Sequence, residues 1–593
     1  MKPSRAIISN SPPTQAPGRD RWLAAALIAA AVFLGYANSI PNEFVFDDKS
    51  VIVDNQKVTR PDWIGIWTGP SWFPLKDDAG WRPATSTTFA FNWLISGNHA
   101  APWRTCTLLL HGVNSILVMR LAALIGAVEP APLIAGLLFA LHPIHTEVLN
   151  PIVGRADVLA TLFLLLCCLA YWKEKFGWVL AFFSLGLFCK ESAVTFLFLL
   201  PFLAWMKSPE RMDWRRLIRD GLPLAAIVGV YALLRKFVIV SAVPPATPEQ
   251  LGWTHFKDVD NPLSQMPLLP RLSNALYIAW RYLFLLAVPA WLSADYSPEA
   301  IPLLGTLSAR NLLSISLMTA GAWFFWRLAR HRRDALFAAA FFICTFILVS
   351  NLPFTFGTIM AERLIYMPSV GFCILLALAL VRLGPRPCAI LSVLILALYA
   401  GRSYVRNQDW KDNDTIFINI LKTSPNSVRA MVNASAILLD QKRYGEARDA
   451  LLKAISLNDS YPLPFNNLGL AYMGLGDLSS AEKAFQQALK RDPGNLDAQV
   501  NIGIVFARSR RLDGAIAAFE EALKQEPDSP KLHYNLALAM KEKAEVLYGW
   551  GQKREARLLF QNAKLHYERA LQIKPDYPEA RANLQALIPW ISR

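Results

Sequence analysis

The chain has 593 residues, of which 54% are hydrophobic and only 18% carry a charge. Soluble domains average about 25% charged residues, and these figures also exclude a disordered chain, a collagen-like repeat and a coiled coil. The charges are unevenly placed, because residues 1–409 contain 59 of them and the 184 residues that follow contain 46. We therefore predict a lipid-embedded first part and a soluble second part.

The formal net charge of +15 does not by itself indicate a nucleic-acid partner. An excess of +11 falls in residues 1–409, where Lys and Arg stand in short clusters between apolar segments. Such clusters are typical of the cytoplasmic loops of membrane proteins, so membrane lipids and not nucleic acid are the expected partners. All seven cysteines lie in the same part, which leaves the C-terminal part without a disulfide framework or a CxxC metal motif.

Eleven segments are apolar and close to the roughly 20 residues that a spanning helix needs. The first follows a basic stretch and lacks a small-residue cleavage site, so we interpret it as a retained signal anchor behind a cytoplasmic tail, residues 1–21. Residues 22–405 form the predicted membrane domain. Its predicted spans are 22–40, 104–127, 131–147, 156–172, 177–189, 191–206, 219–240, 309–327, 335–352, 366–381 and 387–404.

Basic clusters between the spans should face the cytoplasm, and eleven crossings satisfy all of them. A further apolar segment, 274–292, would send the Arg327–Arg333 cluster outward if it crossed, so we expect it to be re-entrant or interfacial. The C-terminal part then lies outside, with 406–425 as a linker and 426–593 as a separate domain. The same side receives the segments where we expect the chemistry, which are 41–103, 142–157, 190–191, 241–308 and 353–365.

The C-terminal part repeats itself every 34 residues. The pattern Asn467-Leu468-Gly469 with Ala481, Phe485, Ala488 and Pro493 returns as Asn501-Ile502-Gly503 with Ala515, Phe519, Ala522 and Pro527. A later copy begins at Asn535 and carries an insert of 14 residues, and a helix from Pro578 caps the series. Small residues at helix contacts, one large apolar residue per layer and a helix-ending proline predict tetratricopeptide repeats, an α-solenoid.

An asparagine occupies the same place in the first helix of each repeat, although helix packing does not require a polar residue there. Stacking would align these side chains as a ladder, which resembles the asparagine ladder of other such arrays, where amides hold an extended peptide backbone. An amide offers two donors and an acceptor, enough to bind the backbone of any sequence. The alternative is that each Asn only satisfies backbone groups between helices. The ladder consists of Asn433, Asn467, Asn501, Asn535 and Asn583.

Few acidic residues lie on the predicted outer side, and two of them are adjacent. Asp47 and Asp48 follow the first span within a few residues. Neighbouring carboxylates at a membrane surface are costly unless something uses them. One use is general base catalysis, in which a carboxylate takes the proton of an acceptor hydroxyl as it attacks a sugar. A solvated turn is the alternative.

A second polar cluster follows the predicted third span. It combines His142, His145, Glu147, Arg155 and Asp157 within sixteen residues. Two His and a Glu could bind a divalent metal, but Pro143 breaks the helix after His142 and the spacing matches no zinc signature, so a metal site is not favoured. No other cofactor is indicated.

Several cationic side chains stand near the outer ends of spans and suit a lipid-linked phosphate. Arg155 and Lys190 are the first two, and the alternative for each is that it only reaches toward the interface. Arg82 and the Glu362–Arg363 pair belong with them, although the pair could be a structural ion pair.

In order along the chain, these motifs resemble the transmembrane and tetratricopeptide-repeat O-mannosyltransferase family. The resemblance covers nearly the whole chain, and the ordered set is specific although each piece alone is weak. The matching motifs are Asn38-Ser39 leading to Phe46-Asp47-Asp48, Trp81-Arg82-Pro83, Leu141-His142-Pro143-x-His145-x-Glu147, Gly154-Arg155-Ala156-Asp157, Lys190-Glu191, Leu269-Pro270-Arg271 with Ile301-Pro302, Ala361-Glu362-Arg363-x-x-Tyr366-x-Pro368-Ser369-Val370-Gly371, and the repeats.

The resemblance implies an all-α fold, a GT-C membrane glycosyltransferase followed by the α-solenoid. The implied donor is a polyprenyl-phosphate-linked sugar, mannose in the animal members, and the implied acceptor is a Ser or Thr hydroxyl of an exported protein. The acid that begins the first outer loop of that fold maps to Asp47 or Asp48, and Glu147 is the third candidate catalytic residue. By analogy we expect a single displacement with inversion. The array is short, so the acceptor could differ from that of the animal members.

Two other functions remain as alternatives. An O-antigen ligase or oligosaccharyltransferase-like enzyme would place its working loop late among the spans, whereas the acids here lie early. A non-catalytic membrane-anchored scaffold would use the repeats alone. For the compartment we favour a bacterial inner membrane over the endoplasmic reticulum, because the ladder residue Asn433 lies in an Asn-x-Ser sequon whose glycosylation would block the groove.

Overall fold

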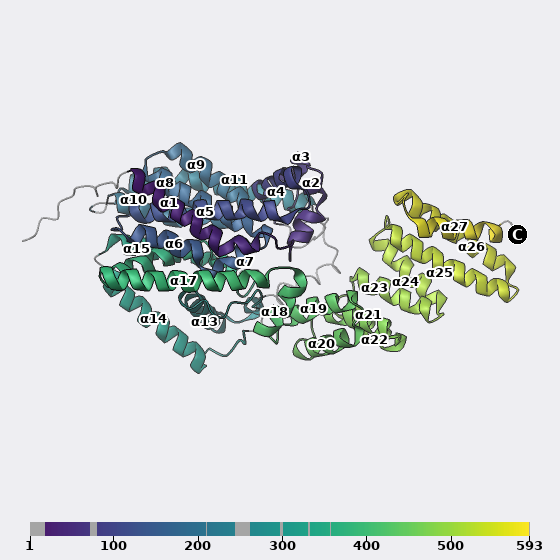
Figure 1. The fold of residues 1–593 in the computed structure, drawn as a ribbon. Coiled ribbons are helices and arrows are strands. Elements are labelled where there is room, and N and C mark those ends of the chain that lie inside the picture. Colours follow the sequence, from purple (N-terminus) through teal and green to yellow (C-terminus); the bar gives the residue numbers. More distant parts are fainter. Residues whose placement is uncertain are drawn as a thin grey trace, which may run out of the picture. The chain divides into compact units, whose positions relative to one another are not determined.

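The computed structural model describes residues 18–71, 80–208, 210, 212–242, 261–296, 301–306, 308–329, 332–355 and 357–591, and these residues form helices, turns and loops without a strand (Figure 1). The chain divides into two compact units. The first unit runs up to Ser424, and the second begins at Pro425. Most of the predicted tail 1–21 and part of the predicted outer loop 241–308 lie outside the described residues.

Fourteen longer helices and three short ones form the described first unit. The short ones are α2 (Gln56–Thr59), α3 (Trp63–Thr68) and α7 (Thr146–Leu149). The longer ones are α1 (Gly18–Tyr36), α4 (Pro83–Ser96), α5 (Ala100–Leu124), α6 (Ala131–Leu141), α8 (Arg155–Trp172), α9 (Phe176–Cys189), α10 (Phe196–Lys207), α11 (Trp214–Ala242), α13 (Leu268–Ala287), α14 (Ala309–Ala329), α15 (Arg333–Phe346), α16 (Ser369–Val381), α17 (Pro385–Asp409) and α18 (Asn413–Thr423).

Each of the eleven predicted spans overlaps one of these helices. Within the described residues, five segments are long and apolar enough to cross a membrane, and they lie on α1, α5, α8, α11 and α17. A sixth is added if α6 and Pro143–Leu149, which meet at 43°, count as one broken span. α9 and α16 are apolar but shorter, so whether they and the other remaining helices cross stays a prediction.

The apolar segment 274–292 forms most of α13. One side of this helix is buried through Ile278, Tyr282 and Leu286, whereas Leu268 and Leu269 are exposed. α13 is not among the helices that are long and apolar enough to span. Its expected re-entrant or interfacial position remains a prediction.

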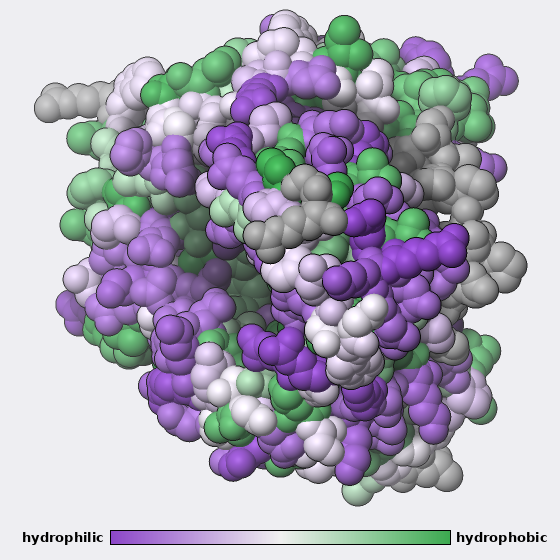
Figure 2. Space-filling view, turned by 90° about the vertical axis from the view of Figure 1, so that its right-hand side faces the viewer, coloured by the Kyte–Doolittle hydropathy of each residue, from purple (hydrophilic) through white to green (hydrophobic). Residues whose placement is uncertain are grey.

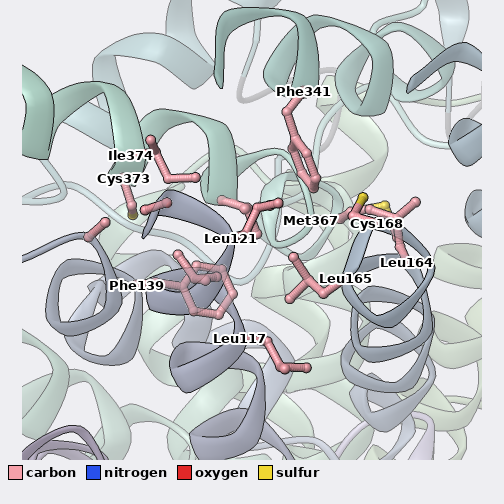
Figure 3. Packing of buried hydrophobic residues seen from close by; sticks show 14 of the residues in the cluster. Leu117, Leu121, Phe139, Leu164, Leu165, Cys168, Phe341, Met367, Cys373 and Ile374 are labelled. Carbon is pink, nitrogen blue, oxygen red and sulfur yellow. The ribbon is translucent and has the colours of Figure 1, made fainter. Parts of the chain in front are cut away.

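The core of the first unit lies where α5, α6, α8, α15 and α16 meet, and Figure 3 shows Leu121, Phe139, Leu165 and Phe341 pointing into it. Between membrane helices, close packing and small contact residues matter more than the hydrophobic effect. Gly371 illustrates the point, since a Cβ there would lie 2.5 Å from the carbonyl oxygen of Ala338. The glycine therefore lets α16 touch the backbone of α15.

The segment 406–425, expected to be a linker, is mostly helical. Its first residues belong to α17, and α18 follows with Ile416, Phe417 and Ile420 buried on one side. The i, i+1, i+4 spacing gives α18 an apolar stripe, and this stripe packs within the first unit.

The second unit is a series of helical hairpins followed by one last helix, as tetratricopeptide repeats predict. Its helices are α19 (Val428–Asp440), α20 (Tyr444–Leu457), α21 (Leu463–Leu475), α22 (Leu478–Arg491), α23 (Leu496–Arg508), α24 (Leu512–Gln525), α25 (Pro530–Gly549), α26 (Lys553–Ile573) and α27 (Pro578–Ile591). The repeated small and large residues pack as expected, because Gly469 leaves room for the ring of Phe485 and a Cβ there would lie 2.5 Å from it. The face shown in Figure 2 is predominantly hydrophilic, in keeping with the charged composition of the repeats.

The 14-residue insert lengthens both helices of one repeat. α19 to α24 have 13 or 14 residues each, whereas α25 has 20 and α26 has 21. Each helix of this pair is thus seven residues longer than its counterparts. Seven residues make about two α-helical turns, so the added length hardly rotates the face that packs inward.

Candidate active site

The predicted outer segments come together through three ion pairs between residues far apart in the sequence. Each pair joins two different segments, and together the pairs link the loop before α4, the 142–157 turn with the start of α8, the 190–191 turn and the 353–365 segment. The pairs are Arg82–Glu191 at 3.2 Å, Lys190–Asp157 at 2.6 Å and Arg363–Glu147 at 2.7 Å. The structure therefore assembles one polar site from the residues that the sequence singled out.

Asp48 is buried in this site and binds backbone amides. Its Oδ2 accepts a hydrogen bond from the amide of Val45 at 3.1 Å, and its Oδ1 accepts one from the amide of Val153 at 2.9 Å. Burial raises the pKa of Asp48 to about 6, against the lowering effect of these amides and of Arg104. Asp48 thus fastens the first outer loop to the 142–157 turn.

Asp47 differs from its neighbour because its side chain is exposed. Its charge acts on Arg363. Burial lowers the pKa of Arg363, but Glu147, Asp47 and Asp157 outweigh it and raise the pKa. The two adjacent carboxylates therefore have different environments, one enclosed by amides and one exposed and within electrostatic range of Arg363.

Glu147 and Arg363 form a two-point contact. The guanidinium Nη1 of Arg363 lies 2.7 Å from Oε1 of Glu147, and the backbone amide of Arg363 donates to Oε2 at 2.9 Å. The Glu147 side chain is 3% exposed and that of Arg363 is 45% exposed. The carboxylate is therefore enclosed, while nearly half of the Arg363 side chain remains exposed.

The other charges of this site lie between the start of α4, the start of α8 and the end of α9. The ammonium of Lys190 contacts both oxygens of Asp157, at 2.6 and 2.7 Å, and its side chain is 9% exposed. Arg82 is 24% exposed and pairs with Glu191. Burial opposes ionisation of Glu191, but Arg82 and Lys190 prevail and lower its pKa to about 2. Glu191 therefore stays charged and holds Arg82 in place.

Arg155 has a different environment from the other cations. It is fully buried, and its guanidinium donates to Thr107 at 3.1 Å, to Asn92 at 2.5 Å and to the carbonyl oxygen of Trp103 at 2.9 Å. It also lies over the Phe89 ring at 5.2 Å. These contacts tie α8 to α4 and α5, so the expected phosphate contact would compete with existing protein contacts.

His142 and His145 are both buried and point to different partners. Nε2 of His142 lies 3.0 Å from the carbonyl oxygen of Leu286, and Nε2 of His145 lies 2.8 Å from the hydroxyl of Ser369. Over the described ranges, no three His, Cys, Asp or Glu side chains are grouped so that they could hold a metal ion. The two histidines join the turn after α6 to α13 and α16.

Glu362 does not pair with its neighbour Arg363. It is fully buried, lies 3.2 Å from Nη2 of Arg406 and accepts hydrogen bonds from the hydroxyl of Tyr296 at 2.6 Å and the amide of Ser293 at 2.7 Å. Burial raises its pKa to about 7, although Arg406 lowers it. This cluster fastens the end of α17 to the segment that follows α13.

Two buried arginines that the sequence analysis did not single out, Arg406 and Arg104, also organise the site. Arg406 pairs with Glu362. The guanidinium of Arg104 donates to the carbonyl oxygens of Asn150, Ile40, Asn42 and Glu43. Both lie in helices apolar enough to span. A charge within an apolar span is a functional or structural signal by default, and it could have identified both.

The five ladder asparagines lie on the first helices of successive repeats, α19, α21, α23, α25 and α27, and each is half-buried. Three of them donate to an earlier helix of the array: Asn467 to Ser435 at 3.4 Å, Asn501 to Asn466 at 3.2 Å and Asn583 to Tyr534 at 3.2 Å. Nδ2 of Asn535 is buried and has no hydrogen-bond partner within the part of the chain that the structure describes. This donor is enclosed, so a ligand could reach it only if the groups around it moved.

Fold and site together define an all-α polytopic membrane protein with a C-terminal tetratricopeptide-repeat array. Family models agree with both parts. Residues 250–322 match the model described as Protein O-mannosyl-transferase TMTC, DUF1736, and tetratricopeptide-repeat models match residues 436–476 and 466–539.

Curated relatives match over most of the chain. Mouse Protein O-mannosyl-transferase TMTC4 is 30% identical over 474 residues, which cover 69% of this chain and 63% of that protein. Human Protein O-mannosyl-transferase TMTC3 is 26% identical, with coverage of 78% and 54%. Among solved structures, YrrB, titled a TPR protein with an unusual peptide-binding site, matches 30% of this chain and 83% of its own with 20% identity and a TM-score of 0.24.

By these matches the chain is similar to the TMTC family of transmembrane and tetratricopeptide-repeat proteins. It spans between about half and two thirds of the length of the curated relatives reported above.

Proposed function

We propose that this protein is a membrane glycosyltransferase that moves a sugar, mannose or a similar hexose, from a polyprenyl-phosphate donor to Ser or Thr hydroxyls of exported proteins. The names of its relatives support the transfer of mannose to protein. The observation that carries the proposal is the exposed carboxylate of Asp47, at the start of the predicted first outer loop, within electrostatic range of the half-exposed Arg363 side chain.

Asp47 is the proposed general base. An acceptor hydroxyl gives its proton to the Asp47 carboxylate while its oxygen bonds to the anomeric carbon of the sugar. The bond between that carbon and the phosphate oxygen breaks in the same step, and polyprenyl phosphate leaves with the electron pair. Attack from the face opposite the phosphate inverts the anomeric configuration. Asp48 supports the base from its buried position and does not itself take the proton.

The leaving phosphate carries the charge that must be stabilised. Arg363 and Arg82 are the proposed phosphate ligands, because their side chains are 45% and 24% exposed. Lys190 and Arg155 are proposed to support the site without contacting the phosphate. Lys190 holds Asp157, and Arg155 holds α4 and α5 against α8. Fixed positive charge near the phosphate stabilises the developing charge, and a nearby carboxylate stabilises an oxocarbenium-like transition state.

The repeats are the proposed site for the acceptor polypeptide. The asparagine ladder offers half-buried amides at the same place in successive repeats, and an amide can bind the backbone of a bound chain. Because these amides would bind the backbone groups of the polypeptide and not its side chains, such a groove would accept many sequences. We place the repeats and Asp47 on the same, extracytoplasmic side, in a bacterial periplasm or, in the alternative, in the lumen of the endoplasmic reticulum.

The test is transfer by the purified full-length protein. The protein is incubated with radiolabelled polyprenyl-phosphate mannose and an unfolded exported protein, and the modified residue and its anomeric configuration are determined. Asp47→Asn should lose at least 100-fold in kcat, since general base catalysis contributes about 10²–10⁴-fold. Asp54→Asn is the matched control, because Asp54 is an exposed carboxylate of the same loop. Equal activity of Asp47→Asn and the wild type, or retention of configuration, would contradict the mechanism.

A further inference from the structure

The backbone next to Asp47 has an unusual conformation. Phe46 has φ of 51°, in the left-handed region that a bulky side chain rarely adopts. Such a conformation persists where surrounding contacts hold it, and it often occurs at functional sites. Phe46 must therefore be held in this conformation by its neighbours.

The contacts come from α18 and from the residue that ends α17. The amide of Phe46 donates to Oδ1 of Asn413 at 2.9 Å, and Asn413 is the first residue of α18. The Phe46 ring lies 5.7 Å from the ring of Trp410 and 5.3 Å from that of Phe417. A further bond runs from the amide of Glu43 to the carbonyl oxygen of Lys411 at 2.9 Å. The loop is therefore held at its backbone and at one aromatic side chain.

The other neighbour of Asp47 is held separately. Asp48 binds the amides of Val45 and Val153, as described above, and the carbonyl oxygen of Asp47 accepts from the amide of Val51 at 2.9 Å. Residues 46 and 48 are thus fixed by different parts of the first unit. The residue between them keeps an exposed side chain on an immobilised backbone.

We infer that Phe46 and Asn413 are positioning residues that aim the Asp47 carboxylate at the acceptor hydroxyl. The inference rests on the proposed function and adds to it, because it assigns part of the catalytic geometry to α18, outside the first outer loop. Misplacing a reacting group by about 1 Å can cost about 100-fold in rate. Releasing Phe46 from α18 should therefore slow transfer without preventing donor binding.

The first experiment removes the hydrogen bond. Asn413→Ala should lower kcat by about 10- to 100-fold while the donor KM and the fraction of molecules that bind donor stay within about twofold of wild type. Asn413→Asp should restore most of the activity, because its carboxylate can accept from the Phe46 amide. Ile418→Ala is the control, since Ile418 lies on α18 and is 54% exposed. A similar loss in Asn413→Asp and Asn413→Ala, or wild-type activity in Asn413→Ala, would overturn the inference.

The second experiment separates the aromatic contact from the backbone conformation. Glycine adopts positive φ without strain, so Phe46→Gly keeps that conformation accessible but removes the contacts with Trp410 and Phe417. It should be about as slow as Asn413→Ala, and Phe46→Tyr should stay close to wild type. Full activity of Phe46→Gly would show that conformation alone suffices and would refute a positioning role for the ring.

A double-mutant cycle distinguishes positioning from general damage. If Asn413 acts through Asp47, Asn413→Ala should cause no further loss in the Asp47→Asn background, whereas an effect on folding would add to it. Full activity of Asp47→Asn alone would refute the proposed function. Loss in Asp47→Asn together with full additivity of Asn413→Ala would refute only the positioning role.

Discussion

The buried pair of Arg406 and Glu362 provides a quantitative test of the structure. Their side chains are 3% and 0% exposed, and Glu362 also accepts from Tyr296 and Ser293. Removing one partner of a buried ion pair leaves an uncompensated charge and costs about 3–5 kcal/mol. Arg406→Met should therefore be strongly destabilising wherever Glu362 is ionised.

The size of this effect should depend on pH. The pKa of Glu362 is raised from 4.5 to about 7, so the folded protein binds its proton more readily than the unfolded chain does. The stabilisation that comes from this protonation is fully present below about pH 4.5 and is lost as pH rises through about 7. At pH 5 the carboxyl is neutral, and Arg406→Met should cost only the lost hydrogen bonds, about 1–2 kcal/mol. At pH 8 it should cost about 3–5 kcal/mol.

Thermal unfolding of the full chain in detergent, followed with a thiol-reactive dye, measures this difference, because six of the seven cysteines are buried. Arg406→Met should lower the apparent Tm by several degrees more at pH 8 than at pH 5, and adding Glu362→Gln should recover most of the loss at pH 8. Arg402→Met is the control, since Arg402 lies one turn away and donates to the carbonyl oxygen of Ala290. Equal losses at both pH values, or no recovery in the double variant, would refute the reasoning.

Three further predictions use the same assays. Gly154→Ala should destabilise the protein and impair transfer, because a Cβ at Gly154 would lie 2.1 Å from the carbonyl oxygen of Val148, whereas Gly229→Ala, with nothing within 4 Å, should be silent in both. Asp48→Ala should lower the apparent Tm, since it leaves two amides without their acceptor at about 1–3 kcal/mol each, and an unchanged Tm would contradict the anchoring role. The lowered pKa of Glu191 stabilises the fold above about pH 4.5, and this stabilisation is lost as pH falls toward 2. Glu191→Gln should therefore make stability less dependent on pH in this acid range. A pH–stability profile parallel to that of the wild type would contradict the role of the Arg82–Glu191 ion pair.

Local sequence patterns predicted much of the fold. The 34-residue period, with Gly469 facing Phe485, predicted the helical hairpins, because each repeat contacts mainly its neighbours. Each predicted span overlaps a helix, since a run of apolar residues is a local property. The segment 406–425 differed from expectation because the Ile416, Phe417 and Ile420 stripe is short and its packing partners come from distant parts of the chain.

The site was less predictable than the fold. Its residues could be nominated one by one, but their roles depend on long-range contacts. Asp47 and Asp48 look equivalent in sequence, and they become different only because Asp48 meets an amide 105 residues away. Likewise, Arg363 stands beside Glu362 in sequence yet pairs with Glu147, 216 residues distant. No pattern of neighbouring residues encodes these pairings.

The lengthened hairpin of α25 and α26 limits how this array can change in length. Its helices are longer than their counterparts by seven residues each, so Asn583 keeps its ladder position although it lies 48 residues after Asn535. An addition of five residues to one helix would rotate everything beyond it by about 140° and take Asn583 out of the line. This repeat can therefore change in length only if both of its helices gain or lose the same number of nearly whole turns.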